Sequence, residues 1–300
     1  MNPWWGHART APTVAPNRGV RHDAGVTHTR RALAELLEQH DLGPSRALGQ
    51  NFVVDPNTVR RIARLANVGP DTPVIEIGAG LGSLTLALAE TGAEVTAVET
   101  DRHLIPVLTD VLADRPNVRL VHGDALTLDW TDLLAAHPSW TLVANLPYNV
   151  ATPLVLDLLA DVPAITRMLV MVQKEAGERL AAGPGDDAYG IPSVKVAYRA
   201  TARLVGRVGP DVFLPRPRVD SALVEIVRRA EPATDADPTV LMALVDRSFN
   251  QRRKMLRSSL KALKPGIDAI LEGVGIPPTA RAEEIALEQF CALARAVQAA

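Results

Sequence analysis

Short apolar runs and amphipathic stretches alternate through the middle of the chain, with polar or glycine-containing turns between them. Short continuous apolar runs are typical of buried strands, and apolar positions three and four residues apart are typical of helices. The pattern predicts strands at residues 74–77, 94–98, 118–121, 141–144, 167–172, 202–208 and 222–227. It predicts helices at residues 30–40, 104–112, 153–159, 175–182 and 194–200, another that carries Ile62, and one that begins at Ser83. This alternation predicts an α/β fold on a mainly parallel sheet.

Both ends of the chain depart from this alternation. Residues 1–29 contain several prolines and glycines and show no apolar periodicity, so we expect a disordered N-terminal tail there. Residues 231–238 have the composition of a linker, and the pattern beyond them is helical. The predicted organisation is a tail at 1–29, an α/β domain at 30–230 and a small helical domain at 231–300.

Composition narrows the cellular setting. Cys291 is the single cysteine of the 300 residues, so no intrachain disulfide is possible, and we expect a cytoplasmic protein in a reducing compartment. No apolar run approaches the length of a membrane span. The net charge of −2 argues against indiscriminate binding to nucleic acid, but it leaves room for local basic patches.

The first predicted strand of the α/β domain runs into a glycine-rich turn and a helix. The turn carries Gly78, Gly80 and Gly82, and glycines there let the backbone approach a nucleotide at the N-terminus of the helix. The third glycine of the dinucleotide-binding pattern would fall at Ser83, which lowers the expectation of an NAD-binding fold without excluding it.

Polar residues end the next strands in order. Glu99 lies about twenty residues past the glycine turn, where a carboxylate is placed to hold both hydroxyls of a ribose, and Asp124 can accept a hydrogen bond from an adenine amino group. Each acid alone is equally well explained as a solvated strand end. Gln50 and Asn51 supply amide groups at a ligand's edge, or are simply polar loop residues. Because the carboxyl ends of parallel strands share one edge, these residues predict a nucleotide site there.

The segment from Asn145 to Tyr148 (Asn-Leu-Pro-Tyr) ends another predicted strand. This segment carries groups that suit the methylation of an exocyclic aromatic amine. Such an amine is a poor nucleophile, because its lone pair is delocalised into the ring. Two acceptors aimed at its N–H bonds, the Asn145 side-chain carbonyl and the Leu146 backbone carbonyl, would draw that lone pair out of the ring plane. Pro147 stiffens the turn, and Tyr148 offers a face for a planar base. Taken alone, the segment could equally be a strand-ending turn.

Two later loops are candidates for contact with the substrate. Residues 183–190 are rich in glycine and aspartate, and we expect a mobile lid. Phe213 precedes spaced prolines, so a rigid loop could expose its ring and, with Tyr148, sandwich a flipped base. The alternative is that Phe213 packs inside, as phenylalanine usually does.

The C-terminal region holds a local excess of positive charge. Residues 240–264 contain seven basic residues against one acid, and Arg253, Arg257 and Lys261 recur every four positions. This predicts a phosphate-contact surface that also includes Arg252 and Lys254, although a solvated helix face would look the same.

Seven ordered motifs resemble the ribosomal RNA small-subunit adenine dimethyltransferases, over the chain from about Arg30 onward. They are Leu-Gly-Gln-Asn-Phe at 48–52, Glu-Ile-Gly-Ala-Gly-Leu-Gly-Ser-Leu-Thr at 76–85, Glu-x-Asp at 99–101, Gly-Asp at 123–124, Asn-Leu-Pro-Tyr-Asn at 145–149, Phe-x-Pro-x-Pro-x-Val-x-Ser at 213–221 and Phe-Asn-Gln-Arg-Arg-Lys at 249–254. The resemblance implies a Rossmann-like domain that uses S-adenosylmethionine, followed by a small helical domain.

The resemblance also implies an activity, a partner and roles for residues. The activity is N6,N6-dimethylation of two adjacent adenosines in a 3′-terminal hairpin of 16S rRNA, within the 30S subunit or its precursor, and we expect a monomer. By motif match, the cofactor is contacted by Asn51, Val53, Gly78, Glu99, Asp124 and Asn145. The target adenine is held by Asn145, Leu146, Tyr148 and Phe213.

The chain departs from the family pattern at two places. Ala79 stands where family members usually have proline, and Asp186-Asp187 replace a basic residue common in the loop, which puts a phosphate contact there in doubt. Three alternatives stay open. They are the related 23S rRNA adenine methyltransferases of macrolide resistance, a non-catalytic assembly or transcription factor on the same fold, and, remotely, an NAD oxidoreductase.

Overall fold

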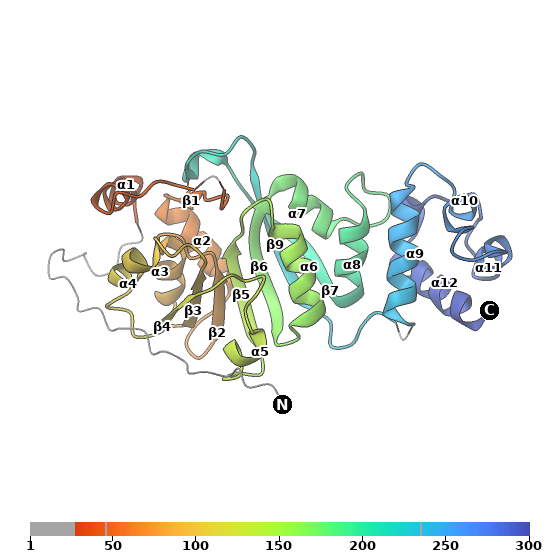
Figure 1. The fold of residues 1–300 in the computed structure, drawn as a ribbon, viewed down its shortest axis with the longest axis horizontal. Helices are drawn as coiled ribbons and strands as arrows, with labels where there is room; N and C mark the ends of the chain where they lie inside the picture. The colour runs from red at the N-terminus through yellow and green to blue at the C-terminus, as the bar shows by residue number, and fades with distance from the viewer. Residues whose placement is uncertain (1–27, 46, 235) are drawn as a thin grey trace, which may run out of the picture.

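The computed structural model describes residues 28–45, 47–234 and 236–300, and most of the predicted tail at 1–29 lies outside them. Its centre is a seven-stranded sheet with the order β4-β3-β2-β5-β6-β9-β7 (Figure 1). The strands are β2 (Pro73–Ile77), β3 (Glu94–Glu99), β4 (Val118–His122), β5 (Trp140–Asn145), β6 (Ile165–Gln173), β7 (Ala200–Val208) and β9 (Ser221–Arg228). Five neighbouring strands are parallel, and β9 is antiparallel to both β6 and β7. Every strand predicted from the sequence is present.

Helices cover both faces of the sheet, and most of them follow a strand in sequence. They are α1 (Arg30–Gln39), α2 (Pro56–Ala66), α3 (Ser83–Ala89), α4 (Ile105–Val111), α5 (Trp130–Leu133), α6 (Ala151–Asp161), α7 (Lys174–Ala181) and α8 (Ile191–Arg199). The short α5 was not predicted. Asp55 caps α2 by accepting a hydrogen bond from the backbone N–H of Thr58 at 2.9 Å.

Alternate residues of the central strands point to opposite faces of the sheet. Ile75 and Leu142 pack with α6 on one face, whereas Val74 and Val143 pack with α2 and α3 on the other. Both faces are buried, which explains why these strands read as nearly continuous apolar runs.

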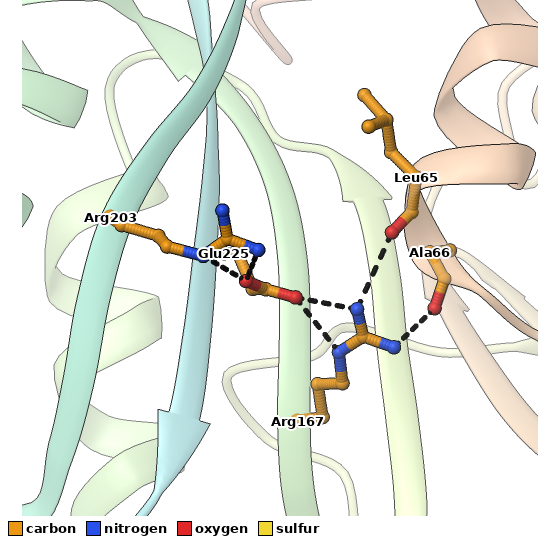
Figure 2. Close-up of polar contacts among 5 residues, drawn as sticks. All are labelled: Leu65, Ala66, Arg167, Arg203 and Glu225. Atoms are coloured by element: carbon orange, nitrogen blue, oxygen red, sulfur yellow. Dashed lines mark hydrogen bonds and ion pairs between the residues drawn. The ribbon is translucent and has the colours of Figure 1, made fainter.

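Glu225 of β9 is the centre of an ion network on the α2 side of the sheet (Figure 2). Its two carboxylate oxygens bind Arg167 of β6 and Arg203 of β7. Arg167 also donates to the backbone carbonyls of Leu65 and Ala66, the last residues of α2. A guanidinium at the C-terminus of a helix is favourable, because the carbonyls there have no partner within the helix. The network therefore ties α2 to the sheet.

A small second sheet was not predicted. Strands β1 (Phe52–Val53) and β8 (Phe213–Leu214) are antiparallel, with Val53 opposite Phe213. Two residues are too few to show a strand period, so the sequence carries no signal for this pairing. The pairing joins the segment before α2 to the proline-rich loop before β9.

The chain ends in a helical region made of α9 (Pro238–Asn250), α10 (Leu256–Leu260), α11 (Ile267–Gly273) and α12 (Leu287–Ala299). These helices share an apolar core with α8, to which Val194 and Tyr198 contribute, and they lie beyond α8, away from the sheet (Figure 1). No helix in the described parts of the chain is long and apolar enough to cross a membrane.

Candidate active site

A pocket opens at the carboxyl ends of β2, β3 and β5, where sheets of this kind bind ligands. Its walls are residues 48–53, the glycine turn after β2, the end of β3 and residues 145–148. A second pocket adjoins it and shares Leu48, Gly78, Thr100 and Pro147 with the first. The predicted edge of the sheet therefore does carry a concave site.

The glycine turn shapes the floor of the first pocket. Gly78 and Gly80 have φ of +77° and +62°, in the left-handed region that favours glycine. A Cβ on Gly80 would lie 3.0 Å from the Phe52 ring, so a side chain at this position would push into the pocket wall. The Gly80 backbone N–H donates to Glu99 Oε2 at 2.8 Å, which joins the turn to the end of β3.

Glu99 is 4% exposed and lines the first pocket. Its other oxygen, Oε1, accepts a hydrogen bond from the Asp101 backbone N–H at 2.8 Å. Burial raises the pKa of Glu99, and the hydrogen bonds from the backbone at Asp101 and Gly80 oppose that shift. The structure thus holds this carboxylate in a fixed orientation at the predicted place.

The other residues assigned to the cofactor divide between the two pockets. Asn51 and Val53 line the first pocket. Gln50 lines it too, but the Gln50 amide already donates to Asp101 Oδ2 at 2.9 Å and accepts from the Ser45 backbone N–H at 2.7 Å. Asp124 is exposed and lines the second pocket. The two sites predicted for one ligand therefore lie in adjoining hollows.

Glu76 is a pocket residue that the sequence analysis did not single out. It is 1% exposed, lines the first pocket, and its Oε2 has no hydrogen-bond partner among the described residues. It stands two residues before Gly78, inside the Glu-Ile-Gly motif, and an acid within a buried strand is a signal that could have identified it.

Asn145 ends β5 at the wall of the first pocket. Its Nδ2 donates to the Asn51 backbone carbonyl at 3.0 Å. This bond orients the side-chain amide and does not use Oδ1, which can accept another hydrogen bond. The Leu146 backbone N–H donates to the Met171 carbonyl at 3.0 Å and fixes the next peptide unit. The Asn145 carboxamide is therefore held by Asn51, just before β1, and the peptide between Asn145 and Leu146 is held by Met171 of β6.

Tyr148 also lines the first pocket, and its ring is held at the hydroxyl end. The hydroxyl lies 2.7 Å from Ser221 Oγ. Burial, assisted by the charge of Asp220, raises the pKa of Tyr148 despite the hydrogen bond to Ser221, so the phenol is neutral at pH 7.

The expectation of an exposed Phe213 ring is wrong. Phe213 is fully buried in the core beneath α2 and does not line either pocket. Its pairing with Val53 in the small sheet turns the ring inward, and the apolar environment accounts for that direction. The base sandwich predicted for Phe213 and Tyr148 is absent from this geometry.

The lid expected at residues 183–190 stays a prediction, although no residue of this loop lines either pocket. The loop is instead bonded to the helical region. The Gly185 backbone N–H donates to the Glu283 carbonyl at 3.1 Å, and the Tyr189 hydroxyl donates to the Ile285 carbonyl at 2.9 Å. Arg252 donates to the Asp187 carbonyl at 3.1 Å.

The five basic residues predicted to contact RNA are all exposed: Arg252, Arg253, Lys254, Arg257 and Lys261. They do not form a stripe on a single helix, because α9 ends at Asn250 and α10 begins at Leu256. Arg252 also pairs with Glu283 at 2.8 Å, so it takes part in the link between the loop and the helical region.

Comparison with known proteins agrees with this geometry. A family model described as ribosomal RNA adenine dimethylase matches residues 45–299. Ribosomal RNA small subunit methyltransferase A of Streptomyces griseus subsp. griseus is 48% identical over 271 residues, which cover 87% of this chain and 92% of that protein.

Two solved structures are similar over most of their length. The 23S rRNA methyltransferase ErmE has a TM-score of 0.65 and 27% identity, covering 82% of this chain and 99% of that one. A dimethyladenosine transferase from Plasmodium falciparum has a TM-score of 0.68 and 23% identity, covering 80% of this chain and 94% of that one, and shows the fold alone. The predicted Rossmann-like methyltransferase fold followed by C-terminal helices is confirmed. The chain belongs to the ribosomal RNA adenine dimethylase family and is an S-adenosylmethionine-dependent methyltransferase.

Proposed function

We propose that the protein dimethylates N6 of two adjacent adenosines in the 3′-terminal hairpin of 16S rRNA, during maturation of the 30S subunit. The choice of the small subunit is supported by the relative of that name, which is 48% identical, against 27% for the 23S enzyme. A cytoplasmic monomer fits this role.

The first pocket fits the methyl donor. A turn of glycines, a buried carboxylate at Glu99 and the unpartnered oxygen of Glu76 suit a ligand that is both a nucleoside and a cation. Glu99 would hold the ribose hydroxyls, while Asn51, Val53, Gly78, Gly80 and Asn145 would border the rest. Asp124 would accept from the adenine amino group in the adjoining pocket. Bound S-adenosylmethionine supplies a methyl group made electrophilic by its positive sulfur.

The observation that carries the proposed chemistry is the orientation of Asn145. Because Nδ2 is bound to the Asn51 carbonyl, Oδ1 is left to accept a hydrogen bond from the target amine. Oδ1 and the Leu146 carbonyl would together polarise N6 toward attack, and this effect is greatest at the transition state, where the nitrogen becomes positive. The N6 proton then becomes acidic and leaves to water, so no strong base is needed.

Tyr148 would provide the stacking surface for the flipped adenine, because its hydroxyl bond to Ser221 fixes the ring at the mouth of the site. Phe213 has no part in this arrangement while its ring is buried. Arg253, Lys254, Arg257 and Lys261 would contact rRNA phosphates from the helical region.

Labelled S-adenosylmethionine offered with purified 30S or 50S particles tests the proposal. Label should enter the 30S particle and map to two adjacent adenosines, and Asn145→Ala should abolish it. Label confined to the 50S particle would favour the 23S enzyme class. Binding of Asn145→Ala to 30S, measured in parallel, would reveal whether an assembly role accompanies catalysis.

A further inference from the structure

The two outer edges of the large sheet carry opposite charge, which the net charge of −2 conceals. Residues 90–137, which include β3 and β4, contain nine acids against three arginines and no lysine. Residues 195–229, which include β7 and β9, contain eight lysines and arginines against three acids. A polyanion is therefore attracted to the β7 side of the sheet and repelled from the β4 side.

A third pocket opens at the end of β7 and shares no described lining residue with the other two. It lies between β7 and the start of α7, and it is lined by Lys174, Glu178, Leu204, Gly206, Arg207 and Ala222. Glu178 Oε1 lies 3.7 Å from Lys174 Nζ, which is long for a charge-assisted hydrogen bond. The Arg207 side chain is exposed and has no ion pair or hydrogen bond within the described parts of the chain. The pocket therefore holds two cations against one loosely paired acid.

A β-bulge brings a third cation to the same end of β7. The register of β7 against β9 shifts between Leu204 and Gly206. A Cβ on Gly206 would collide with the guanidinium of Arg61 from α2, so the glycine leaves the space that Arg61 occupies. Arg61 donates from there to the Arg207 backbone carbonyl at 3.1 Å. Bulges often redirect side chains at sheet edges and beside active sites, and this one seats Arg61 next to Arg207.

The third pocket lies beside the residue that anchors Tyr148. Ser221, whose Oγ is 2.7 Å from the Tyr148 hydroxyl, is flanked in the sheet by the last residue of β6 and the last residue of β7. Lys174 comes directly after the first of these, and Arg207 directly before the second. Because neighbouring strands are about 5 Å apart, both cations stand close to the place proposed for the flipped adenine.

We propose that Lys174 and Arg207 bind a backbone phosphate of the rRNA beside the target adenosine, and that Arg61 contacts the same strand at the edge of the sheet. The inference rests on the proposed function and adds an RNA contact that is separate from the basic residues of the helical region. An adenine that leaves its stack turns its backbone, and contacts to the adjacent phosphates hold the nucleotide in that position. The phosphate replaces Glu178 as the partner of Lys174.

Filter binding to 30S particles across salt concentrations measures the contact. Arg207→Gln and Lys174→Gln should each weaken binding several-fold and lower the slope of log affinity against log salt by about one. Arg61→Gln should weaken binding less, because Arg61 already donates to a backbone carbonyl. Arg119→Gln is the matched control and should bind as the wild type, since Arg119 is an exposed arginine of β4, the opposite outer strand. Melting temperatures should stay within a few degrees of the wild type, and affinity for S-adenosylmethionine should be unchanged.

A double-mutant cycle between protein and RNA locates the phosphate. In reconstituted 30S particles, each phosphate beside the two target adenosines is replaced in turn by an uncharged methylphosphonate. At one position the replacement should weaken wild-type binding several-fold and add little to the loss in Arg207→Gln, because both changes remove the same contact. Losses that add at every position, or an unchanged salt slope in both Arg207→Gln and Lys174→Gln, would overturn the inference and leave the proposed function intact. Failure of the wild type to methylate 30S particles would instead refute the proposed function, and the inference with it.

Discussion

Glu76 and Glu225 are two buried glutamates of one sheet that differ in their partners and in the direction of their pKa shifts. Glu225, at 8% exposure, is bound by Arg167 and Arg203, whereas Glu76, at 1%, has an oxygen with no partner. Burial raises the pKa of Glu225, but the two arginines outweigh it and the net shift is downward, while the pKa of Glu76 rises to about 8. The difference teaches that the fold itself supplies the partners of one buried acid, so that removing a partner should destabilise the protein, and leaves the other with a free oxygen at a pocket, which marks a candidate ligand site.

The largest expected effect comes from the pocket, where removing a group should harm chemistry and spare stability. Asn145→Ala should lower turnover about a thousandfold, because it deletes an acceptor that binds charge developing in the transition state. Affinity for S-adenosylmethionine should stay within a few-fold. Single-turnover methylation and calorimetry measure the two quantities. Asn57→Ala, at an exposed position of α2, is the control and should keep full turnover. Substantial turnover by Asn145→Ala would refute the acceptor role.

The next largest effect is expected in the Glu225 network, where a substitution should lower stability and spare turnover. Arg167→Ala should lower the free energy of unfolding by about 3 kcal/mol, because it leaves a buried carboxylate without its better-buried partner and frees the carbonyls at the end of α2. Denaturant titration measures the change, and turnover per folded molecule should stay within a few-fold. Arg203→Ala is the matched control, because the Arg203 side chain is 71% exposed, and it should cost less than about 1 kcal/mol. A thousandfold loss of turnover in folded Arg167→Ala would break the contrast.

The two acids should also give stability profiles of opposite slope. The folded pKa of Glu76 is raised, so its contribution is present at low pH and is lost as pH rises through about 8, whereas the lowered pKa of Glu225 makes its contribution fade in acid. Between pH 6 and pH 9, the ligand-free wild type should lose roughly 2 kcal/mol more than Glu76→Gln, or about 5 °C in melting temperature. Thermal melts of both proteins across this range measure it. Parallel profiles would show that Glu76 does not titrate there.

This contrast also separates what the sequence predicts from what it does not. The strands and the residues at their carboxyl ends, Glu99 and Asn145, follow from apolar runs and from the shared edge of a parallel sheet. Phe213 was misplaced because a two-residue strand pairing leaves no periodic signal. The sequence also carries no signal for the bonds that the loop at 183–190 makes, because its partners, Glu283 and Ile285, are about a hundred residues away. Partners of that kind are set by tertiary packing.

A smaller effect is expected at Tyr148, which tests whether the pocket uses its ring or its hydroxyl. Tyr148→Ala should lower methylation efficiency by about tenfold or more, because base stacking on an aromatic ring is worth about 1–3 kcal/mol. Tyr148→Phe loses the bond to Ser221 but keeps the ring, and should fall only a few-fold. Steady-state methylation of 30S particles measures both, with Ser221→Ala as the control for the lost hydrogen bond. Equal losses for Phe and Ala would argue against stacking.

The smallest expected effect distinguishes the adjacent Arg252 and Arg253, which differ in their contacts within the protein as the two glutamates do. Arg252 is satisfied by Glu283 and Asp187, whereas no contact with another described side chain is found for Arg253, which is exposed. Arg253→Ala should therefore weaken binding to 30S a few-fold and reduce the slope of log affinity against log salt by about one, because a phosphate contact is lost. Arg252→Ala should leave that slope nearly unchanged and slightly lower stability, because its partly exposed ion pair is worth less than about 1 kcal/mol. Filter binding across salt concentrations measures both. An equal change of slope for the two variants would mean that Arg252 contacts an RNA phosphate despite its bonds to Glu283 and Asp187. A side chain with partners within the protein could then still serve as a ligand contact.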